Sequence, residues 1–269
     1  MKEEKPMAIE VFNRYENKYL INSDDYIRIR SILPRYMKMD EYNVAGACYT
    51  ISNIYYDTFD NALIRNSLAK TRYKEKLRLR SYGVPKLDDL VYLEIKKKYH
   101  GLVTKRRTAI QLKDVYEFLE IKDKPLYKDC MNKQVLCELD YFITHNDLEP
   151  KLYLAYDRVA YLGIEQPDLR ISFDTNIRTR SEDLLLEKGD YGTPLLEDGV
   201  WLMEIKTDHA IPLWLSQLLE KYQIYSSSFS KYGKAYQTYA ASSLKGEKKK
   251  CSSCLTALQN QPSQLIPIF

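Results

Sequence analysis

The chain has 269 residues, and its 41 Lys and Arg against 37 Asp and Glu give a formal net charge of +4. A hydrophobic fraction of 45% supplies enough apolar material for a packed core, which excludes a predominantly disordered protein. Tyr is the unusual component, with 24 Tyr against 7 Phe, and tyrosines suit surfaces that are apolar on one side and wet on the other.

The sequence shows no pattern of a membrane or secretion signal. No stretch approaches the ~20 consecutive apolar residues of a membrane helix, and residues 1–10 mix charges instead of forming an apolar run. The five Cys form no regular framework; Cys251 and Cys254 make the one C-x-x-C pair, and the three His are scattered. We therefore expect a cytoplasmic protein with no transmembrane segment, and zinc or redox chemistry is not favoured.

The first predicted elements are a strand, a helix and a second strand. Alternation over residues 15–21 predicts a strand that carries Glu16 and Lys18 on one face. Ser23 is expected to cap a helix that runs toward Met37, with Pro34 kinking or ending it. A further strand is expected over residues 49–57.

Three predicted strands in the middle of the chain, over residues 74–80, 91–98 and 103–110, collect long cations on one face and aliphatic residues on the other. A helix is expected over 113–120, followed by a strand over 135–143. The charged face of the three middle strands consists of Lys74, Lys76, Arg78, Arg80, Glu94, Lys96, Lys98, Lys105 and Arg107.

The last third of the chain repeats the same pattern. Strands are predicted over 152–161, which carries Arg158, over 169–174, which carries Arg170, and over 201–208, which carries Glu204 and Lys206. A helix is expected over 211–225. Another is expected from Ser230, whose hydroxyl cap, free backbone N–H groups and neighbouring Lys231 form an arrangement that suits phosphate.

A charged strand face has two explanations. In a single antiparallel strand it usually faces solvent, but a solvent face normally mixes the two signs of charge. Here the cations come in runs with a recurring Glu, and neighbouring like charges repel unless a polyanion or hydration relieves them. We therefore predict an α+β fold in which eight or nine antiparallel strands close into a tunnel with a polar lumen and flanking helices.

Eight short motifs occur in order along the chain: Glu16-x-Lys18-Tyr19, Arg78-Leu79-Arg80 with Tyr82-Gly83, Glu94-x-Lys96, Lys105-x-Arg107, Asp157-Arg158, Leu169-Arg170-Ile171-Ser172-Phe173-Asp174, Glu204-Ile205-Lys206 and Phe229-Ser230-Lys231-Tyr232. Over residues 10–240 the chain thereby resembles the VTC (vacuolar transporter chaperone) domain. This domain is the polyphosphate polymerase branch of the CYTH-like triphosphate tunnel metalloenzymes. The resemblance implies a closed antiparallel tunnel. We expect a domain of residues 1–241, and the composition of residues 242–269, with a charge run over 245–250, predicts a flexible tail.

The resemblance also implies an activity, a metal and a set of site residues. The activity is transfer of the terminal phosphoryl group of ATP to a growing inorganic polyphosphate chain, assisted by Mn²⁺ or Mg²⁺. The catalytic set carried over onto this chain is Lys18, Arg78, Arg80, Lys96, Lys105, Arg158, Arg170 and Glu204. Further substrate contacts are Lys76, Arg107, Lys206, Ser230 and Lys231, and the metal ligands are Glu204, Glu16 and Glu94.

The residues themselves agree with phosphoryl transfer, which needs positioning and charge neutralisation more than a covalent nucleophile. One departure concerns the hydrolase and cyclase branch, whose Glu-x-Glu-x-Lys strand has Arg14 here in place of the first Glu. Two alternatives stay open: a tripolyphosphate or nucleoside triphosphate hydrolase of the same fold, and a noncatalytic polyanion-binding module. Nucleic acid is not expected as a partner, because the net charge is small and the cations are predicted to point inward.

Overall fold

The computed structural model describes residues 15–43, 46–100 and 102–241. Within these residues, ten antiparallel strands form one sheet in the order β1-β10-β8-β7-β3-β4-β5-β6, with β2 added to β7 and β9 added to β8. The strands are β1 (Tyr15–Asn22), β2 (Met37–Met39), β3 (Tyr49–Thr58), β4 (Tyr73–Tyr82), β5 (Leu90–Tyr99), β6 (Leu102–Gln111), β7 (Leu148–Gly163), β8 (Arg170–Arg180), β9 (Thr193–Pro194) and β10 (Val200–Thr207).

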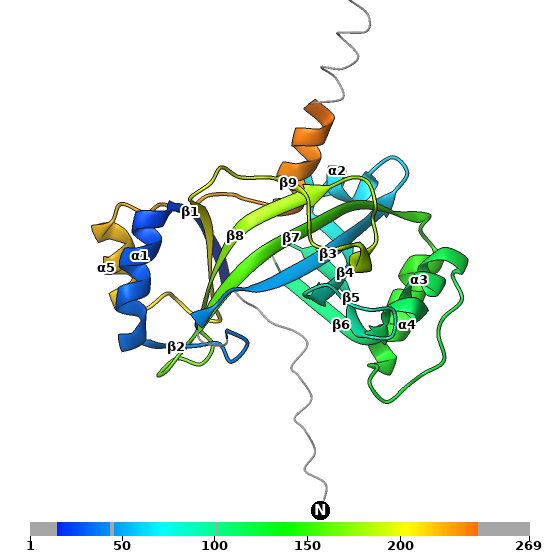
Figure 1. Cartoon of the computed structure of the whole chain (residues 1–269), viewed down its shortest axis with the longest axis horizontal. Coiled ribbons are helices and arrows are strands. Elements are labelled where there is room, and N and C mark those ends of the chain that lie inside the picture. Colours follow the sequence, from blue (N-terminus) through cyan, green and yellow to red (C-terminus); the bar gives the residue numbers. More distant parts are fainter. Residues whose placement is uncertain (1–14, 44–45, 101, 242–269) are drawn as a thin grey trace, which may run out of the picture.

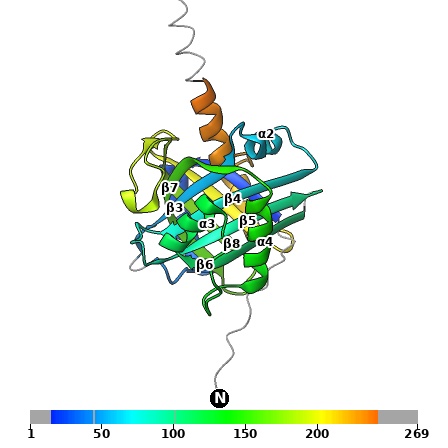
Figure 2. The same ribbon diagram turned by 90° about the vertical axis from the view of Figure 1, so that its right-hand side faces the viewer.

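The sheet curls so that its two ends approach each other, but hydrogen bonds between strands do not close it (Figures 1 and 2). The strands β1 and β6 are the two ends of the order. Glu16 on β1 reaches Lys96 on β5 at 4.0 Å, and the free edge of β1 is used by the backbone N–H of Ser227, which donates to the Lys18 carbonyl at 2.7 Å. An antiparallel α+β fold is therefore confirmed, whereas the closed tunnel is not, because a non-strand segment occupies the edge that closure would need.

One predicted strand is wrong. Residues 135–143 belong to the helix α4 (Lys133–Thr144), whose buried positions Val135, Leu136, Leu139, Phe142 and Ile143 follow the helical period. The Asn132 side chain caps the helix by accepting from the Val135 N–H at 3.0 Å. The β-branched and aromatic residues of this segment favoured a strand, but their spacing is that of a helix.

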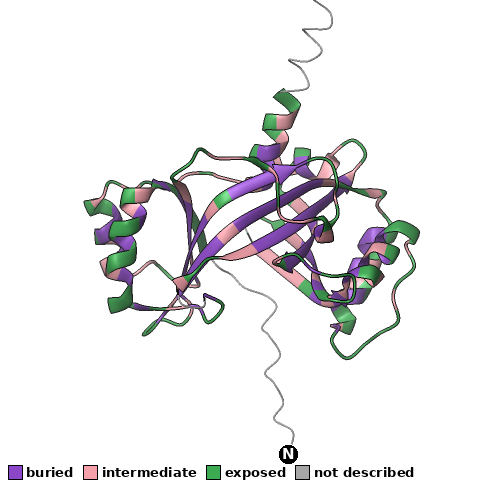
Figure 3. Ribbon diagram, viewed as in Figure 1, coloured by how far each residue is buried: buried purple, intermediate pink, exposed green. Residues whose placement is uncertain are grey.

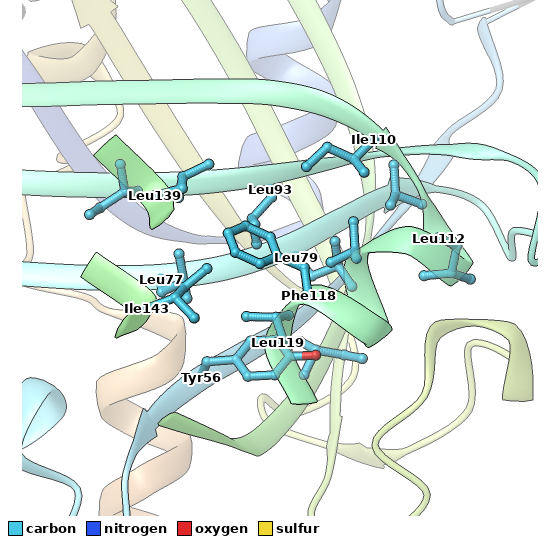
Figure 4. Packing of buried hydrophobic residues seen from close by; sticks show 14 of the residues in the cluster. Tyr56, Leu77, Leu79, Leu93, Ile110, Leu112, Phe118, Leu119, Leu139 and Ile143 are labelled. Carbon is cyan, nitrogen blue, oxygen red and sulfur yellow. The ribbon is translucent and has the colours of Figure 1, made fainter. Parts of the chain in front are cut away.

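Two helical lobes pack on the outer face of the sheet, at opposite ends of the molecule in Figure 1. Helices α3 (Leu112–Ile121) and α4 cover β4, β5 and β6 through a core that Figure 4 shows from close by. Helices α1 (Ser23–Ile32) and α5 (Leu213–Lys221) cover β1, β10 and β8. Because the aliphatic side of each strand faces these helices, its charged side faces the concave side of the sheet.

The helix termini refine two expectations. The cap of α1 is Asn22 rather than Ser23: its Oδ1 accepts from the Asp25 N–H at 2.8 Å. Pro34 does end the α-helix, since it lies in the short 3₁₀ turn Leu33–Arg35 that follows. Helix α2 (Ala62–Leu68) is not among the predicted elements. The carboxylate of Asp57, a buried residue of β3, accepts from the N–H groups of Leu63 and Ile64 in its first turn.

The C-terminal part of the described chain is helical over residues 231–241 and lies beside α2 (Figure 1). Ser230 caps it, with its hydroxyl accepting from the Gly233 N–H at 3.2 Å. Tyr232 stacks on Tyr55 of β3 at 4.4 Å between ring centroids and contacts a third apolar cluster at this end of the sheet. The expected helix start at Ser230 is thus confirmed.

Burial follows the layers of the fold. The strands are largely buried on both sides, while the helices and loops expose their outer surfaces (Figure 3). Among the residues with described structure, no helix has the length and hydrophobicity to cross a membrane.

Candidate active site

Cross-strand register places the predicted strand residues on a single concave surface, which we call the inner face. Lys18 pairs with Glu204, and Arg158 pairs with Asp174. Arg78 pairs with Glu94. Every strand-borne member of the predicted site lies on this face: Glu16, Lys18, Lys76, Arg78, Arg80, Glu94, Lys96, Lys105, Arg107, Arg158, Arg170, Glu204 and Lys206.

Glu204 is the centre of the first charged cluster. Its carboxylate lies 3.0 Å from Lys206, 3.2 Å from Lys231, 3.6 Å from Arg158 and 3.7 Å from Lys18. Burial of the carboxylate opposes ionisation, but the surrounding cations prevail and hold the pKa of Glu204 well below its usual value. An ionised carboxylate is therefore shared by four cations from three strands and the C-terminal helix.

Asp174 extends this cluster. Arg158 donates two hydrogen bonds to it, at 2.6 and 2.8 Å, and Lys231 lies 2.5 Å away. Burial works against the charge of Asp174, yet Arg158 and Lys231 lower its pKa. Because Arg158 and Lys231 contact both Asp174 and Glu204, the two carboxylates fix the cations in place.

Glu94 is the centre of a second cluster, on the strands β4, β5 and β6. Arg78 donates to it at 2.5 Å, Lys105 lies at 2.8 Å, and Arg80 and Arg107 lie at 3.9 Å. Glu94 is 1% exposed; its burial is outweighed by these cations, so its pKa is well below the usual value. Glu94 thus orients Arg78, while its Oε1 is ion-paired with Lys105 and has no partner of hydrogen-bond geometry among the described residues.

Glu16 and Lys76 lie between the clusters. Glu16 is 3.2 Å from Lys18 and 4.0 Å from Lys96; burial raises its pKa, but the neighbouring lysines lower it to about 2. Lys76 forms no ion pair with a carboxylate among the described residues, and burial, together with Lys96 and Lys18, lowers its pKa to about 8. No carboxylate among the described residues therefore offsets the charge of Lys76, and a bound external anion would stabilise it.

Arg170 is set apart from both clusters. It pairs across strands with Lys206, but its guanidinium binds Asp40 at 2.8 Å and is more exposed than those of Arg80 and Arg158. The structure therefore brings Arg170 to the rim of the inner face rather than to its centre.

The balance of charge on this surface is strongly positive. The predicted site residues together with Asp174 comprise eleven Lys or Arg side chains and four carboxylates. Buried cations that exceed their counter-ions cost free energy, which a bound polyanion would offset. The arrangement can hold a chain of phosphates along the sheet, with arginines as planar forks and lysines as point charges.

Several contacts of the site went unpredicted. Asp174 is not among the predicted site residues, although period-two alternation from Arg170 puts it on the same face. Tyr156 and Asn53 hold Arg80 through hydrogen bonds of 3.2 and 3.0 Å. Tyr156 lies two residues before Arg158, so strand periodicity alone would have placed it on the inner face. Outside the described residues lie Arg14 and the segment 242–269, which includes Cys251 and Cys254.

The carboxylates partly suit a hard divalent cation. No group of three or more His, Cys, Asp and Glu in the described part of the chain is arranged to hold a metal. Glu204 and Glu16 both contact Lys18, at 3.7 and 3.2 Å, so two carboxylates converge on one point of the inner face. Mg²⁺ is commonly held by one or two carboxylates, with phosphate and water completing its shell. The donor set therefore fits a cation that binds together with a polyphosphate ligand.

The class of fold is an antiparallel α+β fold in which a curled sheet carries helices on its outer face. The structure resembles the crystal structure of a proposed adenylate cyclase from Bacillus halodurans, with a TM-score of 0.50, 13% identity, and coverage of 82% of this chain and 96% of that chain. At this identity the likeness concerns the fold alone.

Comparison of sequences narrows the class to a family. The model of the VTC domain matches residues 13–240, so the chain belongs to the VTC domain family. It is 28% identical over 275 residues to vacuolar transporter chaperone complex subunit 4 of Trypanosoma brucei brucei, covering 85% of this chain and 35% of that protein. It is 22% identical over 271 residues to subunit 2 of the same complex in Schizosaccharomyces pombe, covering 82% and 37%. The chain thus spans little more than a third of the length of these relatives.

Proposed function

We propose that the chain is an ATP:polyphosphate phosphotransferase that adds the terminal phosphoryl group of ATP to an inorganic polyphosphate chain lying along the inner face. The observation that carries the proposal is the pair of buried carboxylates, Glu204 and Glu94, each surrounded by four cations on one concave surface. Membership of the VTC domain family supports a function related to polyphosphate.

The chemistry requires little covalent help from the protein. An oxygen of the terminal phosphate of the acceptor chain attacks the γ-phosphorus of ATP; the bond from that phosphorus to the β–γ bridging oxygen breaks, and ADP leaves with the electron pair. A terminal phosphate is largely deprotonated at neutral pH, since its second pKa lies at about 6, so no general base is needed. Accordingly, the inner-face carboxylates bind cations and are not free to act as bases.

The residues of the inner face would position the two phosphate chains and stabilise the transferring group. Arg78 and Arg80 are oriented by Glu94, Asn53 and Tyr156, so their guanidinium forks are fixed before substrate binds. Preorganised cations of this kind stabilise charge on the equatorial oxygens of the transition state. Mn²⁺ or Mg²⁺, held by Glu204 and Glu16 together with the phosphates, would supply further charge neutralisation.

The proposal is tested by incubating the chain with ATP and Mn²⁺ or Mg²⁺ and separating the products by gel electrophoresis. We expect polyphosphate longer than the triphosphate of the donor. Arg78→Ala should abolish synthesis while the circular dichroism spectrum stays unchanged, because three cations remain around Glu94. Release of orthophosphate alone would identify a hydrolase, and binding without any product would identify a noncatalytic polyanion-binding module; either result overturns the proposal.

A further inference from the structure

Four tyrosines gather at one end of the inner face and form what we call the tyrosine cluster, Tyr42, Tyr49, Tyr82 and Tyr92. Tyr49 begins β3, Tyr82 ends β4, and Tyr92 lies near the start of β5, so the three strands bring them to the same end of the sheet. Tyr82 lies 6.1 Å from Tyr42, 6.2 Å from Tyr49 and 5.9 Å from Tyr92 between ring centroids. Tyr82 is thus the common neighbour of the other three rings.

The outer rings of the cluster are open to solvent while the inner ring contacts the cations. Tyr42 is 64% exposed and Tyr82 is 46% exposed. Arg107 lies over the ring of Tyr92 at 4.6 Å, and the same guanidinium is 3.9 Å from Glu94. The exposed rings therefore continue directly into the second charged cluster, where phosphates are proposed to bind.

The opposite end of the inner face has a different occupant. There the C-terminal helix places Tyr232 against Tyr55 at 4.4 Å, and Lys76 lies 6.0 Å from the Tyr232 ring. The apolar cluster that contains Tyr232 and Tyr55 extends from this end along β3 as far as Tyr49. Exposed aromatic rings are therefore available to a bulky nucleoside at one end of the inner face. At the other end, the C-terminal helix packs against the sheet.

We propose that the tyrosine cluster binds the nucleobase of the nucleoside triphosphate by stacking, with the triphosphate directed along the inner face toward Lys76. The inference rests on the proposed function, since it concerns the donor of that reaction. Stacking on an aromatic ring is tolerant of the kind of base, because every base has a π face. The site should therefore bind ATP and GTP through the same tyrosines.

The test compares ligands with and without a base. Dissociation constants of ATP, GTP and inorganic tripolyphosphate are measured by calorimetry for the unaltered chain, Tyr82→Ala, Tyr82→Phe and Tyr73→Ala. Tyr73 is the matched control, because it is also 46% exposed and lies at the other end of the same strand. Base stacking is worth ~1–3 kcal/mol, so Tyr82→Ala should weaken the binding of ATP and GTP by a factor between about 5 and about 150.

Tripolyphosphate affinity should stay unchanged in Tyr82→Ala, while Tyr82→Phe and Tyr73→Ala should bind all three ligands normally. Equal losses for ATP and tripolyphosphate would overturn the inference, because they would show that Tyr82 supports the phosphate site. Unchanged ATP affinity in Tyr82→Ala would overturn it as well. If the proposed function is wrong, the unaltered chain forms no polyphosphate. The difference in affinity between ATP and tripolyphosphate can still be measured in that case, so the two failures are distinguishable.

Discussion

Lys76 shows at the level of one residue why the inner face needs a ligand. Its neighbours on the adjacent strand include Lys96, directly opposite it, and the described residues offer it no carboxylate. Like charges directly opposite each other in a sheet are destabilising. Burial and these cations lower the pKa of Lys76 to about 8, so its charge is lost at a lower pH than that of an ordinary lysine.

This pKa predicts an alkaline limit to activity. Lys76 is charged below about pH 8 and neutral above it, so kcat/KM for ATP should fall as pH rises through that value. Lys76→Arg should move the fall to higher pH, because arginine keeps its charge. It should not abolish the fall, since burial also lowers the pKa values of Lys96 and Lys105. A pH profile of kcat/KM that is the same for both proteins would contradict this role.

Glu204 gives a second prediction at this scale. Glu204→Gln leaves Lys18, Arg158, Lys206 and Lys231 without their shared anion, so phosphoryl transfer should fall by roughly a hundredfold or more and lose its response to added Mn²⁺.

Polyphosphate affinity of Glu204→Gln, measured by calorimetry, should be kept or increased, because the surface becomes more positive. The exposed residue Glu117 supplies the control, and Glu117→Gln should behave like the unaltered chain. Full activity in Glu204→Gln would rule out the assigned role.

The sequence predicted the identity of the charged residues better than their partners. Period-two alternation placed Arg78, Glu94 and Glu204 on one face because side-chain direction in a strand is a local property. It could not pair Lys231 with Asp174, since those residues are 57 positions apart and meet only through the packing of the C-terminal helix. It also could not show that Arg170 binds Asp40 at the rim.

At the scale of elements, α4 shows what holds the cationic strands in place. Leu139 of α4 is fully buried in the core that it shares with Leu77 and Leu93, on the outer side of the strands that carry Arg78 and Glu94 (Figure 4). Val135, Tyr141, Phe142 and Ile143 have high strand propensity, which favours a strand at this segment. Spacing of the buried residues and the Asn132 cap were the better signals.

Leu139→Ala should therefore destabilise the fold by about 2–5 kcal/mol through loss of buried area and the cavity left behind. The measurement is urea unfolding, with Tyr141→Ala on the exposed side of the same helix as control, for which little change is expected. A loss of stability as small as that of the control would show that α4 is dispensable for the sheet.

Closure of the sheet is the element-scale feature that the sequence pattern predicts and the structure does not confirm. Eight of the predicted strands form, yet β1 and β6 remain unpaired with each other within the described residues. The strand count alone does not determine closure, because it depends on which backbone groups meet at the edge. Here Ser227 binds the edge of β1, and the Glu16–Lys96 contact joins the two ends of the sheet through side chains.

For the whole molecule, the separation of charge matters more than its sum. The net charge of +4 is small, but the predicted site residues together with Asp174 hold eleven cations against four carboxylates on one surface. Such a surface suits a linear polyanion. Helices α1, α3, α4 and α5 pack on the outer face of the sheet and do not cover this surface. The direct measurement is the balance of products from ATP and Mn²⁺: each ADP formed should be matched by one phosphate in acid-insoluble polymer. ADP matched instead by free orthophosphate would contradict a polymerase.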